Sequence, residues 1–484
     1  MTVRLTLAAI LALSVAPAFG QDSGTKQYDD GGVYSGTFKE GKRHGQGTFT
    51  LPSGYEYTGN WVDGEIKGQG VARFPNGALY EGQFLAGKPD GFGKIILADG
   101  GTYEGDWSDG EINGRGIANL SNGTRFEGEF RNGQYHGTGL LISPSGYRYE
   151  GQWVAGVKEG KGKISFPDGG TYQGGMKGGK RHGEGALVMP DGLTYVGGWE
   201  DDQNHGQGTL TLANGDVYEG AFVAGARQGQ GKRTYPNGDV YVGGFQNDLR
   251  EGDGTLERVD GFSYAGAWVA GRIAGNGTIN YPDGTVYEGA LKDDVPNGQG
   301  KMTYPDGSTY EGDWVDGVNE GQAVARFAGG AVYEGSFKNA KIEGFGKMTI
   351  PSGFIYEGTW SNGLQDGEGK ATYGDGSVYE GSFLAGKRDG QGTLVRPTGY
   401  SYVGGWSADQ INGMGVETYA TGDVYEGELV NGQRSGRGVM RYKNGPVTSG
   451  GWEQGLLTKP DPEPEAEGAE TETATDTATE ADTQ

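Results

Sequence analysis

Residues 126–139 read FEGEFRNGQYHGTG, and these residue types return every 23 positions along the chain. Glycine stands two, eleven and twenty residues after the aromatic residue that opens each copy, here called the anchor. Self-similarity at a fixed period indicates a repeat protein whose units each pack on their neighbours. Eighteen anchors follow one another without insertion or deletion: Tyr34, Tyr57, Tyr80, Tyr103, Phe126, Tyr149, Tyr172, Tyr195, Tyr218, Tyr241, Tyr264, Tyr287, Tyr310, Tyr333, Tyr356, Tyr379, Tyr402 and Tyr425.

Within each unit the side chains alternate with a period of two, which is typical of β-strands. Tyr57, Gly59 and Trp61 fall on one face of a strand, and the residues between them fall on the other. A turn-forming stretch separates this strand from a second one, and a proline-polar-glycine turn such as 75–77 closes the unit. The sequence therefore predicts an all-β fold: an elongated single-sheet antiparallel β-meander of 23-residue hairpins, forming a curved or twisted trough.

The abundant glycine needs a physical reason, because glycine weakens a strand by about 0.5–1 kcal/mol relative to alanine. We expect each missing side chain to let an aromatic ring from the neighbouring strand lie flat on the backbone. The rings would then be buried. The alternative is a ligand-accessible aromatic trough that stacks on a glycan or contacts a partner, and its candidate contacts are Tyr57, Trp61, Trp107, Trp153 and Trp199.

The ends of the chain differ from the repeats. Residues 1–20 contain Arg4, an apolar run and small residues before a cleavage site after Gly20, which is typical of a secretory signal peptide. An exported protein, periplasmic or extracellular, is expected. The predicted organisation is a signal peptide over 1–20, an N-terminal capping half-unit over 21–33, eighteen repeats over 34–447, a C-terminal capping half-unit over 448–457 and a disordered acidic tail over 458–484.

Composition excludes several functional classes. The chain has no cysteine, so disulfides, thiolate catalysis and cysteine-ligated metals are ruled out. A net charge of −24 argues against nucleic acid as a partner, and after signal removal no segment is apolar enough to span a membrane. His182 and His205 occupy equal positions in adjacent units, about 10 Å apart, which is too far to share a metal. We therefore expect no catalytic residue, no metal and no cofactor.

The sequence also resembles a known family. Residues 41–47, 80–84 and 126–139 closely resemble the MORN repeat (membrane occupation and recognition nexus), and the resemblance extends over about 34–455 as an exported, bacterial-type array of about 18 units. It implies an elongated sheet used for scaffolding, self-association and, in some members, contact with membrane lipids. The repeats leave no room for a kinase or methyltransferase segment of the kind that accompanies MORN arrays elsewhere.

Basic pairs at the hairpin turns are the candidates for contact with phosphate or lipid headgroups. They are separated by whole multiples of the repeat, which favours solvated turns over one basic patch. The residues are Lys42, Arg43, Lys180, Arg181, Lys387 and Arg388.

These observations predict a non-enzymatic exported scaffold that binds a partner protein or another copy of itself along its sheet. The alternative is binding of an envelope glycan or a lipid headgroup, through the aromatic trough or at the basic turns.

Overall fold

The computed structural model describes residues 22–462, which form 39 β-strands and no helix. The predicted signal peptide and residues 463–484 of the predicted acidic tail lie outside the described residues. The chain divides after Val259 into two units.

The first unit contains 21 strands: β1 (Asp22–Gln27), β2 (Val33–Lys39), β3 (Lys42–Thr50), β4 (Glu56–Val62), β5 (Glu65–Arg73), β6 (Leu79–Leu85), β7 (Lys88–Ile96), β8 (Thr102–Ser108), β9 (Glu111–Asn119), β10 (Arg125–Arg131), β11 (Gln134–Ile142), β12 (Arg148–Val154), β13 (Val157–Ser165), β14 (Thr171–Lys177), β15 (Lys180–Val188), β16 (Thr194–Glu200), β17 (Gln203–Thr211), β18 (Val217–Val223), β19 (Ala226–Thr234), β20 (Val240–Gln246) and β21 (Leu249–Glu257).

The second unit contains the other 18: β22 (Ser263–Val269), β23 (Arg272–Asn280), β24 (Val286–Lys292), β25 (Val295–Thr303), β26 (Thr309–Val315), β27 (Val318–Arg326), β28 (Val332–Lys338), β29 (Lys341–Thr349), β30 (Ile355–Ser361), β31 (Leu364–Thr372), β32 (Val378–Leu384), β33 (Lys387–Val395), β34 (Ser401–Ser407), β35 (Gln410–Thr418), β36 (Val424–Val430), β37 (Gln433–Arg441), β38 (Val447–Glu453) and β39 (Leu456–Pro460).

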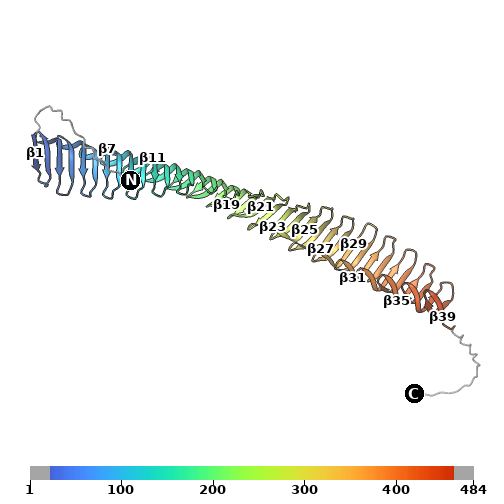
Figure 1. Cartoon of the computed structure of the whole chain (residues 1–484). Helices are drawn as coiled ribbons and strands as arrows, with labels where there is room; N and C mark the ends of the chain where they lie inside the picture. The colour runs from blue at the N-terminus through green and yellow to red at the C-terminus, as the bar shows by residue number, and fades with distance from the viewer. Residues whose placement is uncertain (1–21, 463–484) are drawn as a thin grey trace, which may run out of the picture. The chain divides into compact units, whose positions relative to one another are not determined.

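Within each unit every strand pairs antiparallel with the next strand along the chain, as in β8–β9, β9–β10 and β10–β11 (Figure 1). A strand of seven residues alternates with one of nine, so each 23-residue repeat contributes one hairpin. The prediction of an all-β antiparallel meander of hairpin repeats is confirmed.

The hairpin turns explain why glycine occupies some of its repeated positions. In the repeat that starts at Phe126, the two-residue loop is Asn132-Gly133, and both residues have positive φ (49° and 72°). Asparagine followed by glycine is the preferred sequence for this turn. The register then shifts after Gly128, and Gly137 takes a φ of 60° in the resulting bulge. Glycine is favoured eleven residues after the anchor because this bulge position has a positive φ. That conformation is strained for a residue that carries a Cβ.

In most repeats the glycines two and thirteen residues after the anchor lie under the ring of that anchor. Tyr103 covers Gly105 on its own strand and Gly116 on β9, and a Cβ added to Gly116 would lie 2.4 Å from Cε2 of Tyr103. The ring makes edge-to-face contacts with Trp107 (centroids 5.6 Å apart) and with Phe130 on β10 (5.0 Å). Such pairs are each worth about 0.5–1.5 kcal/mol beyond their buried area. Anchors and the side chains four residues after them thus form a continuous row in each unit, here called the ring row.

The ring row also satisfies its polar atoms. The Tyr103 hydroxyl donates to the carbonyl of Asp106 (2.9 Å), and the Trp107 Nε1–H donates to the carbonyl of Gly93 (3.2 Å). Because both donors are paired with backbone oxygen, the rings can be buried without an unsatisfied polar group.

The predicted C-terminal boundary needs a correction. The last strand ends at Pro460, which lies opposite Gly450, so three residues assigned to the acidic tail belong to the sheet. Backbone pairing with β38 continues beyond the last apolar side chain, and proline is tolerated at the end of an edge strand.

Candidate partner-binding surfaces

The aromatic residues considered as glycan or partner contacts are buried in the ring row. Neighbouring rings and glycine backbone occupy the surfaces on which a sugar would stack. The structure thus leaves no ring of this set open to a ligand. Their exposed fractions are 0 % for Tyr57, 2 % for Trp61, 8 % for Trp107, 4 % for Trp153 and 4 % for Trp199.

The basic pairs at the turns divide into an inner arginine and an outer lysine. The Arg181 guanidinium lies 4.1 Å from the ring centroid of Trp199, and its Nε donates to Asp202 Oδ1 (2.9 Å). Burial opposes ionisation of Asp202, but the hydrogen bonds and charge of Arg181 hold the pKa of that carboxyl below its usual range. This arginine therefore stabilises the contact between successive hairpins.

Arg43 and Arg388 stack in the same way on Trp61 (4.1 Å) and Trp406 (4.3 Å). Only the lysines of the three pairs point outward, and all are exposed: Lys42, Lys180 and Lys387. A phosphate group could meet these lysines singly, but the structure does not bring them together with their arginines into one cationic site.

His44 occupies a linking position that the sequence did not reveal. His44 Nδ1 accepts the backbone N–H of Asp63 in the next hairpin turn (3.3 Å). In other repeats the same position holds Asp90 or Asn113, whose side-chain oxygens accept the corresponding N–H at 3.1 and 2.9 Å. Histidine is thus interchangeable with other acceptors here. Among residues 22–462 no group of three or more histidine, aspartate or glutamate side chains could hold a metal ion.

Two repeats place charge in the otherwise apolar interior beside the ring row. Arg233 Nη2 donates to Asp216 Oδ2 (2.6 Å), and Asp216 is only 4 % exposed. In the second unit Glu417 is 6 % exposed and accepts the hydroxyl of Tyr400 (2.6 Å) and that of Tyr419. Each pair joins consecutive repeats, because Asp216 and Arg233 belong to neighbouring repeats and Tyr400 precedes the repeat that holds Glu417. These contacts tie hairpins together and are not a ligand site.

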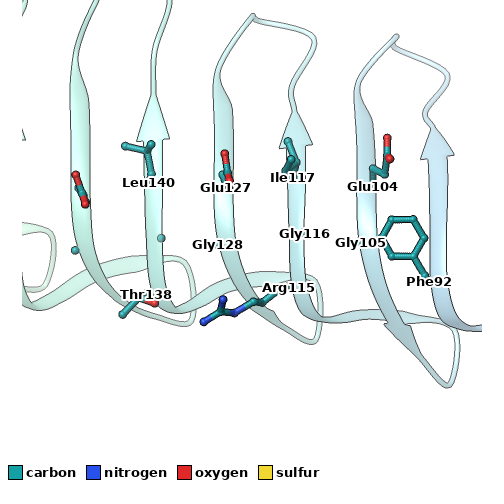
Figure 2. A pocket seen from close by; sticks show the side chains of 13 residues that line it. Phe92, Glu104, Gly105, Arg115, Gly116, Ile117, Glu127, Gly128, Thr138 and Leu140 are labelled. Carbon is teal, nitrogen blue, oxygen red and sulfur yellow. The ribbon is translucent and has the colours of Figure 1, made fainter.

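The opposite face of the sheet is open and hollowed, and it is here called the groove face. In the first unit a hollow of about 640 Å³ extends over β7–β12, and its floor consists of glycine backbone (Figure 2). A second hollow of about 740 Å³ shares Glu150 with it, and a third of about 660 Å³ shares Glu184 with the second. The glycines that accept rings on one face therefore leave a continuous furrow on the other.

Apolar side chains line the first hollow between charged ones. Figure 2 shows Glu104, Ile117, Glu127 and Leu140 along one side of the glycine floor. Phe92, also on this face, is 56 % exposed. Phe92, Ile117 and Leu140 line one hollow and are here called the apolar strip. A single exposed apolar residue needs no explanation, but several in one hollow indicate a binding surface.

The glutamates beside this strip are paired with basic residues of the same chain. Glu104 lies 3.3 Å from Lys94 Nζ, and Glu127 lies 2.6 Å from Arg125 Nη2. Both pairs are solvent-exposed, so they add little stability. Ile117 and Leu140 therefore alternate with ion-paired glutamates along the hollow, and such a mixture of apolar and polar groups is common in protein–protein contacts.

The sequence prediction missed the apolar strip. The available signal was the appearance of phenylalanine, isoleucine and leucine twelve or fourteen residues after an anchor. At these outward-facing positions many other repeats carry glutamine, threonine or lysine.

The geometry defines a class: a hairpin-repeat protein with one filled face and one open face. Eighteen consecutive segments match the MORN repeat family, and the chain belongs to that family: 34–54, 57–79, 80–102, 103–125, 126–146, 149–171, 172–194, 195–217, 218–240, 241–262, 264–286, 287–309, 310–332, 333–354, 356–378, 379–399, 402–424 and 425–447. The predicted array of about 18 units is confirmed. The family is a non-enzymatic repeat scaffold for interaction with proteins or membranes.

Solved structures with local similarity share little sequence with this chain. The TCP10 domain of CPAP from Danio rerio is 18 % identical, with a TM-score of 0.24 over 44 % of this chain and 95 % of that one. The G-box domain of the microcephaly protein CPAP is 16 % identical, with a TM-score of 0.24 over 41 % and 98 %. The SAS-4 TCP domain of Drosophila melanogaster, solved with a proline-rich motif of Ana2, is 15 % identical, with a TM-score of 0.21 over 36 % and 86 %.

No curated protein matches the chain. Within residues 22–462 no helix has the length and apolar character needed to cross a membrane.

Proposed function

We propose that this protein is an exported, non-enzymatic MORN-repeat scaffold that binds a partner protein along the groove face of its first unit. The observation that carries the proposal is the hollow over β7–β12, where an apolar strip lies in the open beside exposed ion pairs. The ring row holds this surface rigid, so a partner would lose little affinity to ordering of the scaffold.

The partner would be a polypeptide with apolar side chains for Ile117 and Leu140 and polar groups for the glutamates between them. Binding of an envelope glycan or a lipid headgroup is the alternative. That alternative would rely on groove-face amides and outward lysines such as Lys180, because the aromatic rings are buried and Arg181 is engaged.

Site-specific cross-linking tests the proposal. A photoreactive phenylalanine analogue at position 92 should form a covalent adduct with a protein in envelope extracts. Leu140→Asp should reduce that adduct by about tenfold or more, because a buried carboxylate opposes desolvation of the contact. Val154→Asp is the matched control: Val154 is an exposed apolar residue (51 %) at the end of β12 that does not line the hollow, and its replacement should leave the adduct unchanged.

Equal adduct formation by both aspartate variants would contradict a role for the groove. Retention on purified glycan or on vesicles, lost in Leu140→Asp, would favour the alternative.

Export has its own test. N-terminal sequencing of the protein recovered from the periplasm or medium should begin at Gln21, as expected for signal peptide cleavage after Gly20. Recovery of the full-length chain in the cytoplasm alone would contradict export.

A further inference from the structure

The first strand of the sheet has one edge that the described chain does not cover. Among residues 22–462, β2 is the strand that pairs with β1, and all six residues of β1 are exposed. An exposed edge presents unpaired backbone N–H and C=O groups and is a template for pairing with another chain.

The ring row is also incomplete at this end. The side chain four residues after each later anchor is buried, from Trp61 (2 % exposed) to Leu429 (0 %). The first member, Phe38 in β2, is only half-buried. One flank of Phe38 therefore lacks the cover that every later member of its row receives.

The last strand is different. Strand β39 has five residues, pairs with β38 through a register shift between Gly451 and Trp452, and ends in Pro460, which has no N–H to donate. Short length, a bulge and proline are the features by which proteins block an edge. The six-residue β1 contains no proline and has no register shift against β2.

The register of the sheet specifies how β1 would pair. Glycine lies opposite glycine in successive pairings: Gly24 opposite Gly36, Gly36 opposite Gly47 and Gly47 opposite Gly59. A two-fold axis through Gly24 would place it opposite Gly24 of a second copy and would keep the ring faces of both copies on the same side. The resulting antiparallel pair sets Asp22 opposite Lys26 of the second copy, twice by symmetry.

We propose that β1 is a self-association site, at which two copies of this chain join their sheets across a two-fold axis with glycine opposite glycine and Asp22 opposite Lys26. Opposite charges at facing positions stabilise an antiparallel pair, and like charges destabilise it. The contact is one short strand pair, so the dimer is weak, with a dissociation constant on the order of micromolar or above. This inference goes beyond the groove proposal and does not depend on it.

Sedimentation velocity of the purified processed chain tests the site through its charges. The wild type should show a concentration-dependent dimer. Asp22→Lys or Lys26→Asp should each weaken dimerisation by about tenfold, and the double variant carrying both should recover most of the loss. Lys459→Asp in β39 is the matched control and should not affect dimerisation.

A chain that stays monomeric up to about 500 μM, well above the expected dissociation constant, would overturn the proposal. A dimer that responds to neither single charge reversal would overturn it as well, because the contact would lie elsewhere. Both measurements use the chain alone, so their outcome leaves the groove proposal standing or falling by its own cross-linking test.

Disulfide formation tests the register directly. The chain has no cysteine, and a Cβ at Gly24 would lie an ordinary 3.9 Å from Phe38 Cε2, so Gly24→Cys can be accommodated. Facing residues of an antiparallel pair are close enough for a disulfide. Gly24→Cys should therefore oxidise to a covalent dimer, and Thr25→Cys, which would face Ser23, should oxidise far more slowly. Equal oxidation of the two variants would contradict the proposed register.

Discussion

The two faces of the same strands compare directly in β8 and β9. On one face, Tyr103 lies over Gly105 and Gly116 and leaves no space. On the other face, Glu104 and Ile117 stand in an open hollow floored by the same two glycines. The comparison teaches that one register has two consequences: removal of side chains makes a core on the ring face and a furrow on the groove face. Substitutions on the ring face should therefore lower stability, and substitutions on the groove face should weaken binding.

Alkaline pH should have the largest effect on the stability of the fold, because it acts on the tyrosines of the whole ring row. Burial raises the pKa of Tyr57, Tyr80 and Tyr149 to about 12, above the ordinary value near 10. The unfolded chain loses these protons first, so the stabilisation is complete below pH 10 and is lost as pH rises from 10 to 12. Circular dichroism and tyrosinate absorbance should change together in that interval. Of the 28 tyrosines, 17 are anchors and 11 lie elsewhere. Ionisation of more than those 11 at pH 10, with an intact β spectrum, would contradict burial of the row.

Loss of one ring should have the next largest effect. Trp153→Ala removes a buried indole and its hydrogen bond to the carbonyl of Gly139, at a cost of about 3–5 kcal/mol in unfolding free energy. Hydrogen exchange should increase in β11–β13 more than in distant repeats, because each hairpin packs mainly on its neighbours. Trp153→Phe is the control, since Phe130 fills the same position in β10, and it should cost about 1 kcal/mol. Equal effects would argue against a packing role for the indole.

The buried ion pair offers a test of charge on the ring face. Arg233→Leu leaves the Asp216 carboxylate buried without its partner, and it should destabilise the first unit by about 3 kcal/mol, as measured by denaturant unfolding. The double variant Arg233→Leu with Asp216→Thr reproduces the combination of Thr124 and Leu141 at the equivalent positions and should recover most of that loss. No recovery would show that Arg233 acts through its stacking on Tyr235 (4.3 Å) instead.

The smallest expected effect is the difference in stability between alanine substitutions at two glycine positions. Gly116→Ala places a methyl group 2.4 Å from the Tyr103 ring and should cost about 1–3 kcal/mol through overpacking. Gly329 has open space around its Cβ position and no positive φ, so Gly329→Ala should change stability by no more than about 0.5 kcal/mol. Thermal unfolding of the two variants measures the difference, and equal destabilisation would refute close ring contact as the reason for glycine at position 116.

The fold could be predicted from the sequence because its cause is local and repeated. Alternation such as Tyr57-Thr58-Gly59-Asn60-Trp61 indicates a strand, and eighteen copies in phase leave no room for another element type. The candidate surfaces were predicted less well. Adjacent residues such as Lys180 and Arg181 point in opposite directions, and the stacking of Arg181 on Trp199 joins residues 18 positions apart in the chain.

The sequence by itself determined the hairpin period, the antiparallel order and the placement of ring against glycine, because each depends on residues within one repeat or its immediate neighbour. Only the tertiary structure decided which face is open. The bend and bulge of the strands turn a row of bare glycines into the floor of a hollow lined by Ile117 and Leu140. The structure also showed that Phe38 at the first edge lacks cover, because burial depends on which strands lie beside a ring and not on the ring's own repeat.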